Sequence, residues 1–430
     1  MRVLVIGATG LIGGAVTARL LASGHQVVGI ARRTGAAARG VKAAEWVTFD
    51  IAAARRPDHW FPYLGEIDAV VNCAGVLQDS PFESTRAVHV EGTAHLYAAC
   101  EQLGVRCVVH FSAIGVDRET PTAFSQTKLA ADRALMTRNL DWVILRPSVV
   151  VGAAAYGGSA LFRGLAALPM LPVMPDTGPL QPVQLDDVVE TVALCLTPKV
   201  PPGTALDLAG PDKLSFLDII RLYRRWLGWG EARVLRLPRW AAALLYVLGD
   251  FAGWLGWRPP MRSTARHEIA RGATGDPSLW MRVTGIVPQS LAEALAAHPA
   301  SVQERWFSRM YFLKPTVIAI LSLFWVITGL IAFGPGYRVG VGLMQQGGAG
   351  IPGEASVITG AFADILIGIG IALRRTVRPA LYVAIAVSLF YVVAGTAITP
   401  WLWLDPLGPL VKAGPILALT LVALAVLEDR

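Results

Sequence analysis

The chain has 430 residues, which is enough for two or three domains. Its net charge of +7 comes from dispersed Lys and Arg residues, and no basic tract is interleaved with aromatic residues, so nucleic-acid binding is not expected. The mean hydropathy of +0.50 is high for a soluble enzyme, and charges become sparse from Lys314 onward. A soluble part followed by a membrane part is therefore predicted. The histidines and cysteines have no metal-ligand spacing, and no metal site is predicted.

Apolar strands alternate with helices through the first 150 residues. Strands are predicted at 2–6, 26–31, 45–49, 67–72, 107–112 and 142–145. Helices are predicted at 15–23, 85–103 and 124–138. Elements that alternate at this spacing form a parallel, doubly wound sheet with right-handed crossovers. The sequence therefore predicts an α/β fold with a Rossmann-like core at residues 1–150.

A glycine turn follows the first strand directly. Its residues, all predicted to contact a cofactor, are Gly7, Ala8, Thr9, Gly10, Leu11, Ile12 and Gly13. Three glycines at this spacing allow backbone N–H groups to approach a pyrophosphate, and the next helix adds the partial positive charge of its N-terminus. The order strand, turn and helix favours a dinucleotide site over a purely structural turn.

Arg32 and Arg33 follow the second strand, where an acid would bind the ribose hydroxyls of NAD(H). Arginine suits a 2′-phosphate instead, so NADP(H) is expected in preference to NAD(H), with one of the two side chains solvated. Asp50 ends the third strand. It either meets the adenine edge or forms a turn, and the sequence leaves both interpretations open. Ile51 is also predicted to contact the cofactor.

Residues 151–300 are predicted to form a smaller subdomain of the substrate-binding type. The region opens with a Gly- and Pro-rich stretch and continues with helices from Leu185 and over 215–227. Residues 240–257 are apolar, with Trp at both ends, but Gly249, Asp250 and Gly253 interrupt them. These interruptions favour a helix that packs on the subdomain or lies in the membrane interface over one that crosses the bilayer.

The last part of the chain, 301–430, is predicted to be a four-helix transmembrane domain. Its apolar stretches lie at 315–333, 355–373, 379–398 and 413–427, and the fourth is short for a span. Asp364 is the single ionisable residue inside them. It is either a functional group or an acid that joins helices through a hydrogen bond, with Tyr391 and Thr396 as partners to consider.

The charges that flank these stretches predict their orientation. Arg305, Arg309 and Lys314 precede the first stretch, and Arg374, Arg375 and Arg378 connect the second to the third. An excess of Lys and Arg marks the cytoplasmic side. A multi-pass protein of the cell inner membrane is therefore expected, with the nucleotide domain and both termini in the cytoplasm.

Several motifs together resemble the extended and atypical short-chain dehydrogenase/reductases. They are the glycine turn, Asp50, Asn72–Gly75, Ser112, Lys128, Arg146–Ser148 and Val183–Val188. The resemblance covers roughly residues 1–300 and is nearest to the branch of the NADPH-binding accessory subunit of respiratory complex I, while the tail resembles a DoxX-type membrane domain. It implies that Cys73, Ala74 and Gly75 line the ribose and nicotinamide, and that Pro147 lies near the nicotinamide. It also implies that Lys128 holds the ribose.

The chain departs from the family at the catalytic tyrosine. Active members carry Tyr four residues before the Lys, whereas this sequence has Phe124 before Lys128. Phenylalanine has no proton to give, and Ser112 can polarise a carbonyl but is a weaker acid than a phenol. Ser125 would point to another side of the helix, and a role for Tyr156 requires a shifted alignment.

Two functions from different classes remain open. The first is an NADP(H)-dependent oxidoreductase that acts on a membrane-soluble partner, such as a quinone or an isoprenoid lipid, with Ser112 and Lys128 as catalytic candidates. The second is a catalytically silent scaffold or assembly subunit that binds a membrane protein partner in a respiratory complex. A sugar-nucleotide epimerase is disfavoured because epimerisation also needs the phenol that Phe124 replaces.

Overall fold

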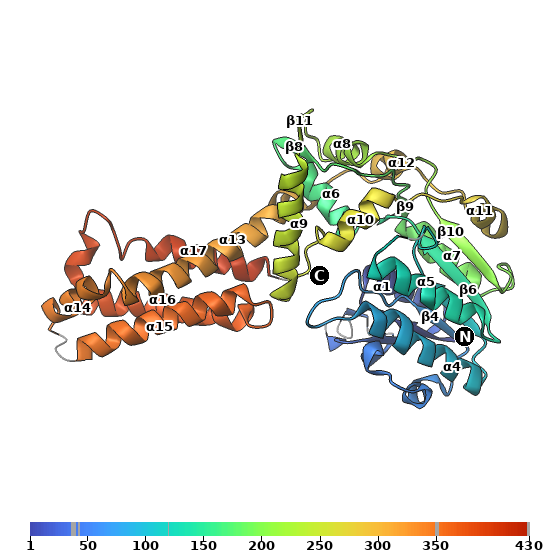
Figure 1. Ribbon diagram of the computed structural model, residues 1–430, viewed down its shortest axis with the longest axis horizontal. Coiled ribbons are helices and arrows are strands. Elements are labelled where there is room, and N and C mark those ends of the chain that lie inside the picture. The colour runs from blue at the N-terminus through green and yellow to red at the C-terminus, as the bar shows by residue number, and fades with distance from the viewer. Residues whose placement is uncertain (36–39, 42–43, 119, 349–351, 428–430) are drawn as a thin grey trace. The chain divides into compact units, whose positions relative to one another are not determined.

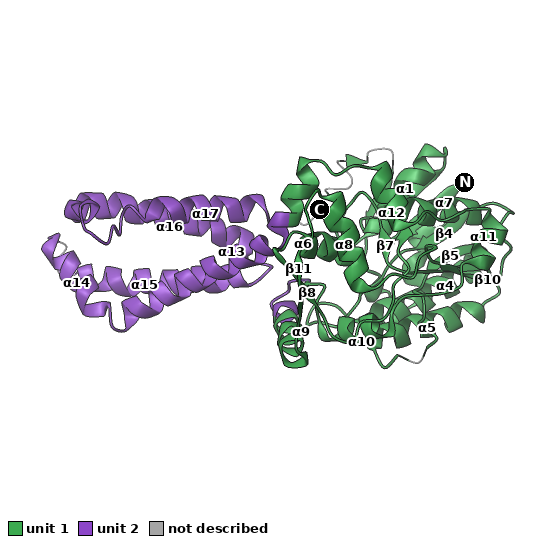
Figure 2. Cartoon of the chain, turned by 90° about the horizontal axis from the view of Figure 1, so that it is seen from above, with its two compact units in different colours: residues 1–251, 259–308 green, residues 252–258, 309–430 purple. Residues whose placement is uncertain are grey.

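The computed structural model describes residues 1–35, 40–41, 44–118, 120–348 and 352–427 (Figure 1). Its contacts divide the chain into two compact units (Figure 2). The first comprises residues 1–251 and 259–308, and the second comprises residues 252–258 and 309–430. The boundary falls inside two continuous helices, α9 (Arg239–Trp254) and α13 (Val302–Phe333).

The first unit is built on a seven-stranded parallel sheet with the order β10-β6-β5-β4-β1-β2-β3. The strands are β1 (Arg2–Ile6), β2 (Gln26–Ala31), β3 (Glu45–Thr48), β4 (Ala69–Asn72), β5 (Cys107–Phe111), β6 (Asp141–Pro147) and β10 (Thr204–Leu208). Runs such as Val3–Ile6 are buried on both faces, as parallel sheets require. The predicted doubly wound fold is confirmed.

Helices cover both faces of this sheet (Figure 1). Successive side chains of β1 alternate, so that Val3 and Val5 enter one core and Leu4 and Ile6 the other. The first core includes residues of α1 (Leu11–Ala22), α7 (Leu185–Cys195) and α11 (Ser278–Thr284). The second includes residues of η2 (Pro57–Trp60), α3 (Phe61–Leu64), α4 (Gly92–Leu103) and α5 (Ala123–Met136).

The rest of the first unit forms a smaller layer with two pairs of short strands. The pairs are β7 (Val150–Val151) with β9 (Val183–Gln184) and β8 (Met170–Val173) with β11 (Arg233–Arg236). The helices are α6 (Gly157–Ala166), α8 (Phe216–Trp226), α10 (Ser263–Arg271) and α12 (Leu291–Ala297), besides η1 (Ile51–Ala53) and η3 (Ala87–Glu91) nearer the sheet. Because β10, α7 and α11 return to the sheet, residues 151–300 contribute to both layers. The division at residue 150 stays a prediction.

The second unit is helical. Its elements are the larger part of α13, then α14 (Tyr337–Gln346), α15 (Pro352–Ala372), α16 (Val377–Ile398), η4 (Pro400–Trp403) and α17 (Ala413–Ala425). Among the described residues, α13, α15 and α16 are long and apolar enough to cross a membrane. Helix α17 has 13 residues and is about 20 Å long, which is short of a hydrocarbon core of about 30 Å.

Helix α13 begins well before the apolar stretch that starts at Pro315. Ser301 opens it, because its backbone N–H donates to Glu304 at 2.8 Å and its hydroxyl accepts from Gln303 N at 3.1 Å. The helix then continues through Pro315. A proline removes one backbone hydrogen bond, but α13 remains helical before and after Pro315.

Small residues allow α13 and α15 to approach closely. A Cβ on Gly368 would lie 2.7 Å from the carbonyl oxygen of Ser322, and one on Gly329 would lie 2.6 Å from that of Ala361. The Ser322 hydroxyl donates to Gly368 O at 2.8 Å. Packing through small residues and interhelical hydrogen bonds is typical of membrane helices, which gain nothing from hydrophobic burial between them.

Candidate functional site

The predicted site residues meet at one edge of the sheet. Gly7 follows β1, Arg32 follows β2, Cys73 follows β4, Ser112 follows β5, and Pro147 ends β6. Because all these strands are parallel, their carboxyl ends lie along the same edge. The chain order reverses between β1 and β4, and such switch points are where open α/β sheets bind nucleotides.

Glycines shape the turn after β1 because its backbone is too crowded for side chains. Gly7 has a φ of +75°, and a Cβ there would lie 3.1 Å from the backbone of Cys73. A Cβ on Gly13 would collide with the carbonyl oxygen of Gly7. Gly10 N donates to that same oxygen at 2.9 Å and closes the turn. The turn therefore exposes the bare backbone that a pyrophosphate can approach.

Helix α1 begins at the end of this turn without a side-chain cap. Gly10 is its N-cap residue, and the first turn of this fully described helix contains no acid. N–H groups at a helix start lack internal partners, and the helix dipole favours negative charge there. The residues of the turn thus fit the pyrophosphate of a dinucleotide.

Arg32 lies at the cofactor edge, but an acid already binds it. Its guanidinium is 2.7 Å from the carboxylate of Glu83, which lies in the loop where Ser80 and Glu83 pair. Arg33 is exposed. A 2′-phosphate at this edge would therefore compete with Glu83 for Arg32.

Asp50 and Ile51 both have structural roles. Asp50 Oδ1 accepts from Ala52 N at 3.0 Å and caps η1. Ile51 is buried in the core, and its carbonyl packs against Gly92. Asp50 thus forms a turn, one of the two roles left open by the sequence. The adenine contact of Asp50 and the cofactor contact of Ile51 stay predictions.

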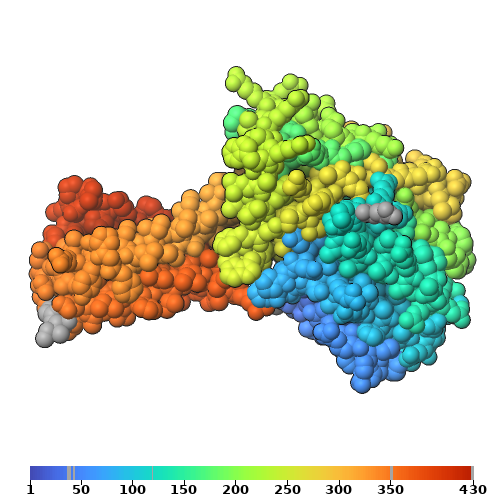
Figure 3. Space-filling view, viewed as in Figure 1, coloured from blue at the N-terminus to red at the C-terminus, as the bar shows by residue number. Residues whose placement is uncertain are grey.

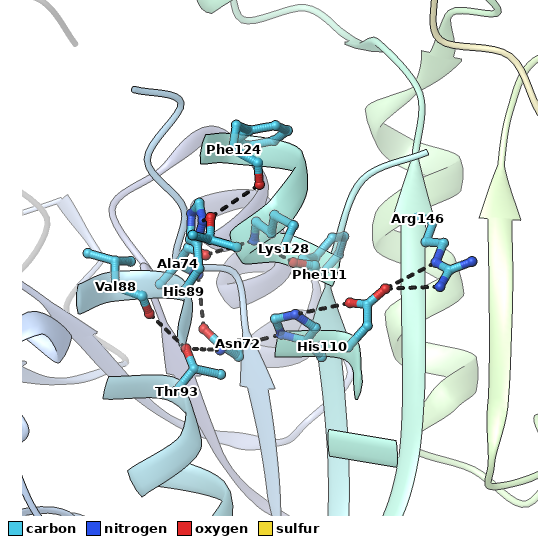
Figure 4. A network of polar contacts seen from close by, with 12 residues as sticks. Asn72, Ala74, Val88, His89, Thr93, His110, Phe111, Phe124, Lys128 and Arg146 are labelled. Atoms are coloured by element: carbon cyan, nitrogen blue, oxygen red, sulfur yellow. Dashed lines mark hydrogen bonds and ion pairs between the residues drawn. The ribbon is translucent and has the colours of Figure 1, made fainter. Parts of the chain in front are cut away.

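Residues 72–75 lead from β4 into the site and are held from both sides (Figure 4). Asn72 Oδ1 accepts from Ala74 N at 3.1 Å, and Lys128 Nζ donates to Ala74 O at 3.2 Å. Burial raises the pKa of the Cys73 thiol to about 12. The thiol is therefore neutral near pH 7, and this segment forms a fixed wall, not a nucleophile.

Lys128 and Phe124 lie one turn apart on α5 (Figure 4). Lys128 Nζ also donates to Phe111 O at 2.7 Å, and burial lowers the pKa of the ammonium group to about 8. The Phe124 ring packs edge-on against the ring of His89, with 5.8 Å between centroids. The buried ammonium group of Lys128 therefore lies one helical turn from Phe124, the position of the family's catalytic tyrosine.

His89 is a neutral link between two elements. Its Nε2 accepts from Val76 N at 2.9 Å, and its Nδ1 lies 2.8 Å from Thr127 Oγ1. Because a backbone N–H must donate, the ring proton is on Nδ1. Burial, followed by the charge of Lys128, lowers the pKa of His89 to about 2. The residue joins the loop after β4 to α5 and does not supply a proton near pH 7.

Ser112 lies beside a buried ionic network that the sequence does not reveal. Asp132 accepts from Arg146 Nε at 3.2 Å and from Arg146 Nη2 at 3.0 Å, and His110 Nε2 is 3.7 Å from its other oxygen (Figure 4). Burial raises the pKa of the Asp132 carboxyl, while the Ser112 hydroxyl and Arg146 oppose that shift. The Ser112 hydroxyl is buried beside Asp132 but makes no hydrogen bond within the described residues, so its proton stays available to a substrate carbonyl.

Ser125 points toward α10 and not toward the reaction centre. Its hydroxyl donates to Glu268 at 2.8 Å and accepts from Arg271 at 2.7 Å. Glu268 and Arg271 also form a largely buried ion pair at 2.8 Å. This cluster joins α5 to α10, and it leaves Ser125 unable to replace the missing phenol.

Two family models match the chain. A model described as NAD(P)H-binding matches residues 7–161, and one described as a DoxX-like family matches residues 322–421. The glycine turn and parallel sheet agree with the first match, and the three long apolar helices agree with the second.

Curated relatives align with between half and two thirds of this chain. An uncharacterised protein of Mycobacterium tuberculosis is 28% identical over 219 residues, which is 51% of this chain but only 23% of that protein. Photosystem II assembly factor Ycf39 of Synechocystis is 24% identical over 266 residues, 60% of this chain and 76% of Ycf39. Ceramide reductase of Caulobacter vibrioides is 23% identical over 239 residues, 55% of this chain and 73% of the reductase.

Solved structures share the fold of the first unit. MoeE5 in complex with UDP-glucose and NAD aligns with a TM-score of 0.53 at 20% identity, over 73% of this chain and 100% of that one. UDP-glucuronic acid 4-epimerase from Bacillus cereus in complex with NAD aligns with a TM-score of 0.54 at 20% identity, over 72% and 100%. The chain is thus an NAD(P)-binding protein with relatives among epimerases and reductases of the short-chain dehydrogenase/reductase type. Its C-terminal part is DoxX-like, and the predicted fold and the predicted resemblance to NAD(P)-binding and DoxX-like families are confirmed.

Proposed function

We propose that the chain is a membrane-anchored, NADP(H)-dependent reductase whose acceptor is a lipid-soluble quinone or carbonyl compound. The observation that carries this proposal is the row of residues from the glycine turn to Lys128, in a chain with three apolar helices of membrane length. A tether to the bilayer raises the local concentration of the nucleotide domain near a lipid acceptor. The expected location is the cytoplasmic side of the inner membrane, with both termini in the cytoplasm.

Each part of the site has a role in this proposal. The glycine turn and the start of α1 bind the pyrophosphate, and Arg32 binds the 2′-phosphate after it leaves Glu83. Lys128 binds the nicotinamide ribose through its ammonium group, and Pro147 bounds the nicotinamide. The cofactor supplies the hydride, and the protein orients the acceptor.

Phe124 influences which acceptor can be reduced. Hydride transfer to an isolated carbonyl produces an alkoxide, a strong base that needs a nearby acid, and Phe124 offers none. Hydride transfer to a quinone produces a phenolate-type anion, a much weaker base that water can protonate. The balanced reaction is NADPH plus quinone plus one proton, giving NADP⁺ plus hydroquinone. A quinone is therefore the acceptor class that this centre suits best.

A second function, a catalytically silent assembly or scaffold subunit, has its own support. Lys128 already donates to two backbone carbonyl oxygens, at 2.7 and 3.2 Å, and so stabilises the fold without a substrate. The relative Ycf39 is named as an assembly factor. In this alternative the bound nucleotide is structural, and the helices bind a membrane protein partner in a respiratory complex.

The two functions are separated with the full-length protein in lipid nanodiscs. NADPH oxidation is followed with a short-chain quinone and with lipid aldehydes and ketones, and Gly13→Ala serves as the variant with a blocked nucleotide site. Quinone-dependent oxidation that Gly13→Ala abolishes supports the reductase. Tight NADPH binding without turnover on any acceptor favours the scaffold. Absence of nucleotide binding would exclude both.

A further inference from the structure

Helix α9 lies on the surface of the protein (Figure 3, yellow-green) and carries a stripe of exposed apolar side chains. Its members, each at least 51% exposed, are Trp240, Leu244, Val247, Leu248, Phe251 and Trp254. At about 100° per residue these positions fall within a stripe about 120° wide. Six large apolar side chains on one helix face form a continuous apolar surface, and such surfaces mark interaction sites.

The opposite face of α9 is fixed to the first unit. Ala242 and Tyr246 pack in a cluster with Met174, and Gly249 lies against the backbone of Met261. Asp250 accepts from Gln78 Nε2 at 2.8 Å and from Ser263 N at 3.2 Å. The helix therefore has one defined orientation, and its apolar stripe points away from the body of this unit.

The C-terminal end of α9 and the residues after it belong to the second unit. There Trp257 Nε1 donates to Ala372 O at 2.7 Å, and Arg374 N donates to Leu255 O at 3.1 Å. The guanidinium of Arg374 lies over the Trp257 ring, 5.3 Å from its centroid. Ala372 ends α15, so this contact lies at the end of a membrane-length helix, where Trp and Arg are typical of the membrane–water interface.

The charges around α9 complement an anionic lipid surface. The segment from Arg233 to Arg262 contains five arginines and one acid, Asp250. Arg262 is buried and pairs with Asp250, and Arg239 pairs with Asp176, so the charge available to lipid comes from the other arginines. Arg233 and Arg236 are exposed on β11, directly before the helix. Basic residues next to an apolar helical stripe with Trp at its ends are typical of a helix that lies in the headgroup region.

We propose that α9 lies in the plane of the membrane interface, on the side of the membrane where Arg374 connects α15 to α16. Its apolar stripe then lies among the acyl chains, and the exposed arginines next to it lie at anionic headgroups. A transmembrane course is excluded by length, since 16 residues span about 24 Å. Lipid is favoured over a protein partner because the same helix is continuous with residues packed at the end of α15. The inference is independent of whether the protein catalyses a reaction.

This position connects the bilayer to the nucleotide site. Asp250 binds Gln78, and Gln78 Oε1 also accepts from Thr264 N at 3.2 Å. Gln78 belongs to the loop that follows Gly75, a predicted wall of the cofactor site. An interfacial α9 is therefore joined through Asp250 and Gln78 to the loop that borders the predicted cofactor site.

Site-directed spin labelling of the full-length protein in nanodiscs with anionic lipid tests the proposal. Labels at Val247→Cys and Phe251→Cys are compared with a control at Leu103→Cys, an exposed apolar position at the end of α4. The wild-type chain has four cysteines, so the spectrum of the wild-type chain treated with the same label is subtracted from that of each variant. NADPH binding by each variant verifies that it is folded.

At the two α9 positions we expect high collision rates with oxygen and at least a threefold lower rate with a water-soluble nickel chelate than at Leu103. Equal access of the nickel chelate to positions 247 and 103 would overturn the proposal. Protection of the α9 labels from both reagents would also overturn it, because protein would then cover the stripe.

Discussion

The guanidinium of Arg32 lies 2.7 Å from the carboxylate of Glu83 at the edge where the 2′-phosphate of NADP is expected. The acid is mostly buried, with 12% of its side chain exposed, whereas Arg32 is 42% exposed. NADP would exchange one anion on Arg32 for another, but NAD would leave the ion pair intact. The preference for NADP therefore depends on how much more strongly Arg32 binds the 2′-phosphate than it binds Glu83.

Removing the competing acid is expected to strengthen that preference. Glu83→Gln leaves a side chain of the same shape without charge, and it is expected to tighten NADPH binding about fivefold, which corresponds to roughly 1 kcal/mol for a partly exposed pair. NADH affinity is expected to change little. Titration calorimetry of the full-length protein measures both, with Arg32→Gln and Arg33→Gln as matched variants. If Arg33→Gln loses the preference for NADPH and Arg32→Gln keeps it, Arg33 binds the 2′-phosphate and the assignment to Arg32 is wrong.

The glycine turn offers a controlled test of nucleotide binding. Gly13→Ala places a methyl group against Gly7 O, whereas Gly14→Ala places one at an ordinary 3.5 Å from Ala8 O. We expect Gly13→Ala to weaken NADPH binding about 100-fold, or roughly 3 kcal/mol, and Gly14→Ala to change it less than threefold. NADPH fluorescence reports both affinities. Similar affinities for the two variants would contradict a nucleotide in this turn.

The features that the sequence predicts well are local ones. The glycine turn, the apolar strands and the positions after each strand follow from neighbouring residues, because strand alternation and backbone space are set within a few positions. Parallel strands then bring Gly7, Cys73 and Ser112 to one edge without further information. The absence of a polar face likewise predicts α15 and α16, because the apolar stretches 355–373 and 379–398 overlap them almost completely.

The features that the sequence does not predict are pairings between distant residues. Arg32 meets Glu83, Ser125 meets Glu268, and Asp132 meets Arg146 only because the fold brings loops and helices together. Each of these side chains is an ordinary surface type in sequence, so composition and spacing give no signal. The stripe on α9 has a visible period, but the sequence does not say which face packs.

Lys128 gives nucleotide binding a pH dependence. Its pKa of about 8 means that the ammonium form, which donates to ribose hydroxyls, is lost above that pH. NADPH affinity is therefore expected to be constant from about pH 6.5 to 7.5 and to fall as the pH rises through 8. The free energy of unfolding is expected to change in the opposite direction. Burial penalises the charged form of Lys128 in the folded protein, so stability rises as the pH increases from the folded pKa of about 8 to the ordinary value of 10.5.

Variants at position 128 check this assignment by titration of affinity against pH. Lys128→Arg stays charged, so its affinity is expected to remain flat through pH 9. Lys128→Met is expected to bind more weakly at pH 7 and to show no transition near pH 8. If the methionine variant retains the wild-type transition, another group titrates and the assignment to Lys128 is wrong.

Phe124→Tyr restores the missing proton donor. Lys128, one turn away, would lower the pKa of the new phenol, and general acid catalysis typically contributes about 100-fold or more. We expect lipid ketone reduction to rise at least tenfold and quinone reduction to change little, since a quinone does not need the acid. Phe124→Leu is the control for altered packing against His89. No gain on any carbonyl would mean that the proton donor does not limit turnover.

Asp364 and Tyr391 join two membrane helices. The Tyr391 hydroxyl on α16 donates to Asp364 Oδ1 on α15 at 2.9 Å, and Asp364 is only 4% exposed. Of the two partners considered from the sequence, Tyr391 makes this bond, while the Thr396 hydroxyl donates to Val392 O at 2.7 Å. The arrangement favours a role in helix association, with a functional role as the alternative.

A double-mutant cycle separates these roles. Tyr391→Phe and Asp364→Leu are each expected to lower stability in mixed micelles by about 1 kcal/mol, with a coupling energy of about 0.6 kcal/mol, because either change removes the same bond. Asp364→Asn keeps an acceptor for Tyr391 and is expected to retain most of the stability. Stability is measured by unfolding in denaturing detergent, and turnover or NADPH binding is measured in parallel. The amide of Asp364→Asn can still accept the hydrogen bond from Tyr391, but it cannot carry a charge or transfer a proton. If this variant keeps the fold but loses turnover, the carboxyl group therefore takes part in function.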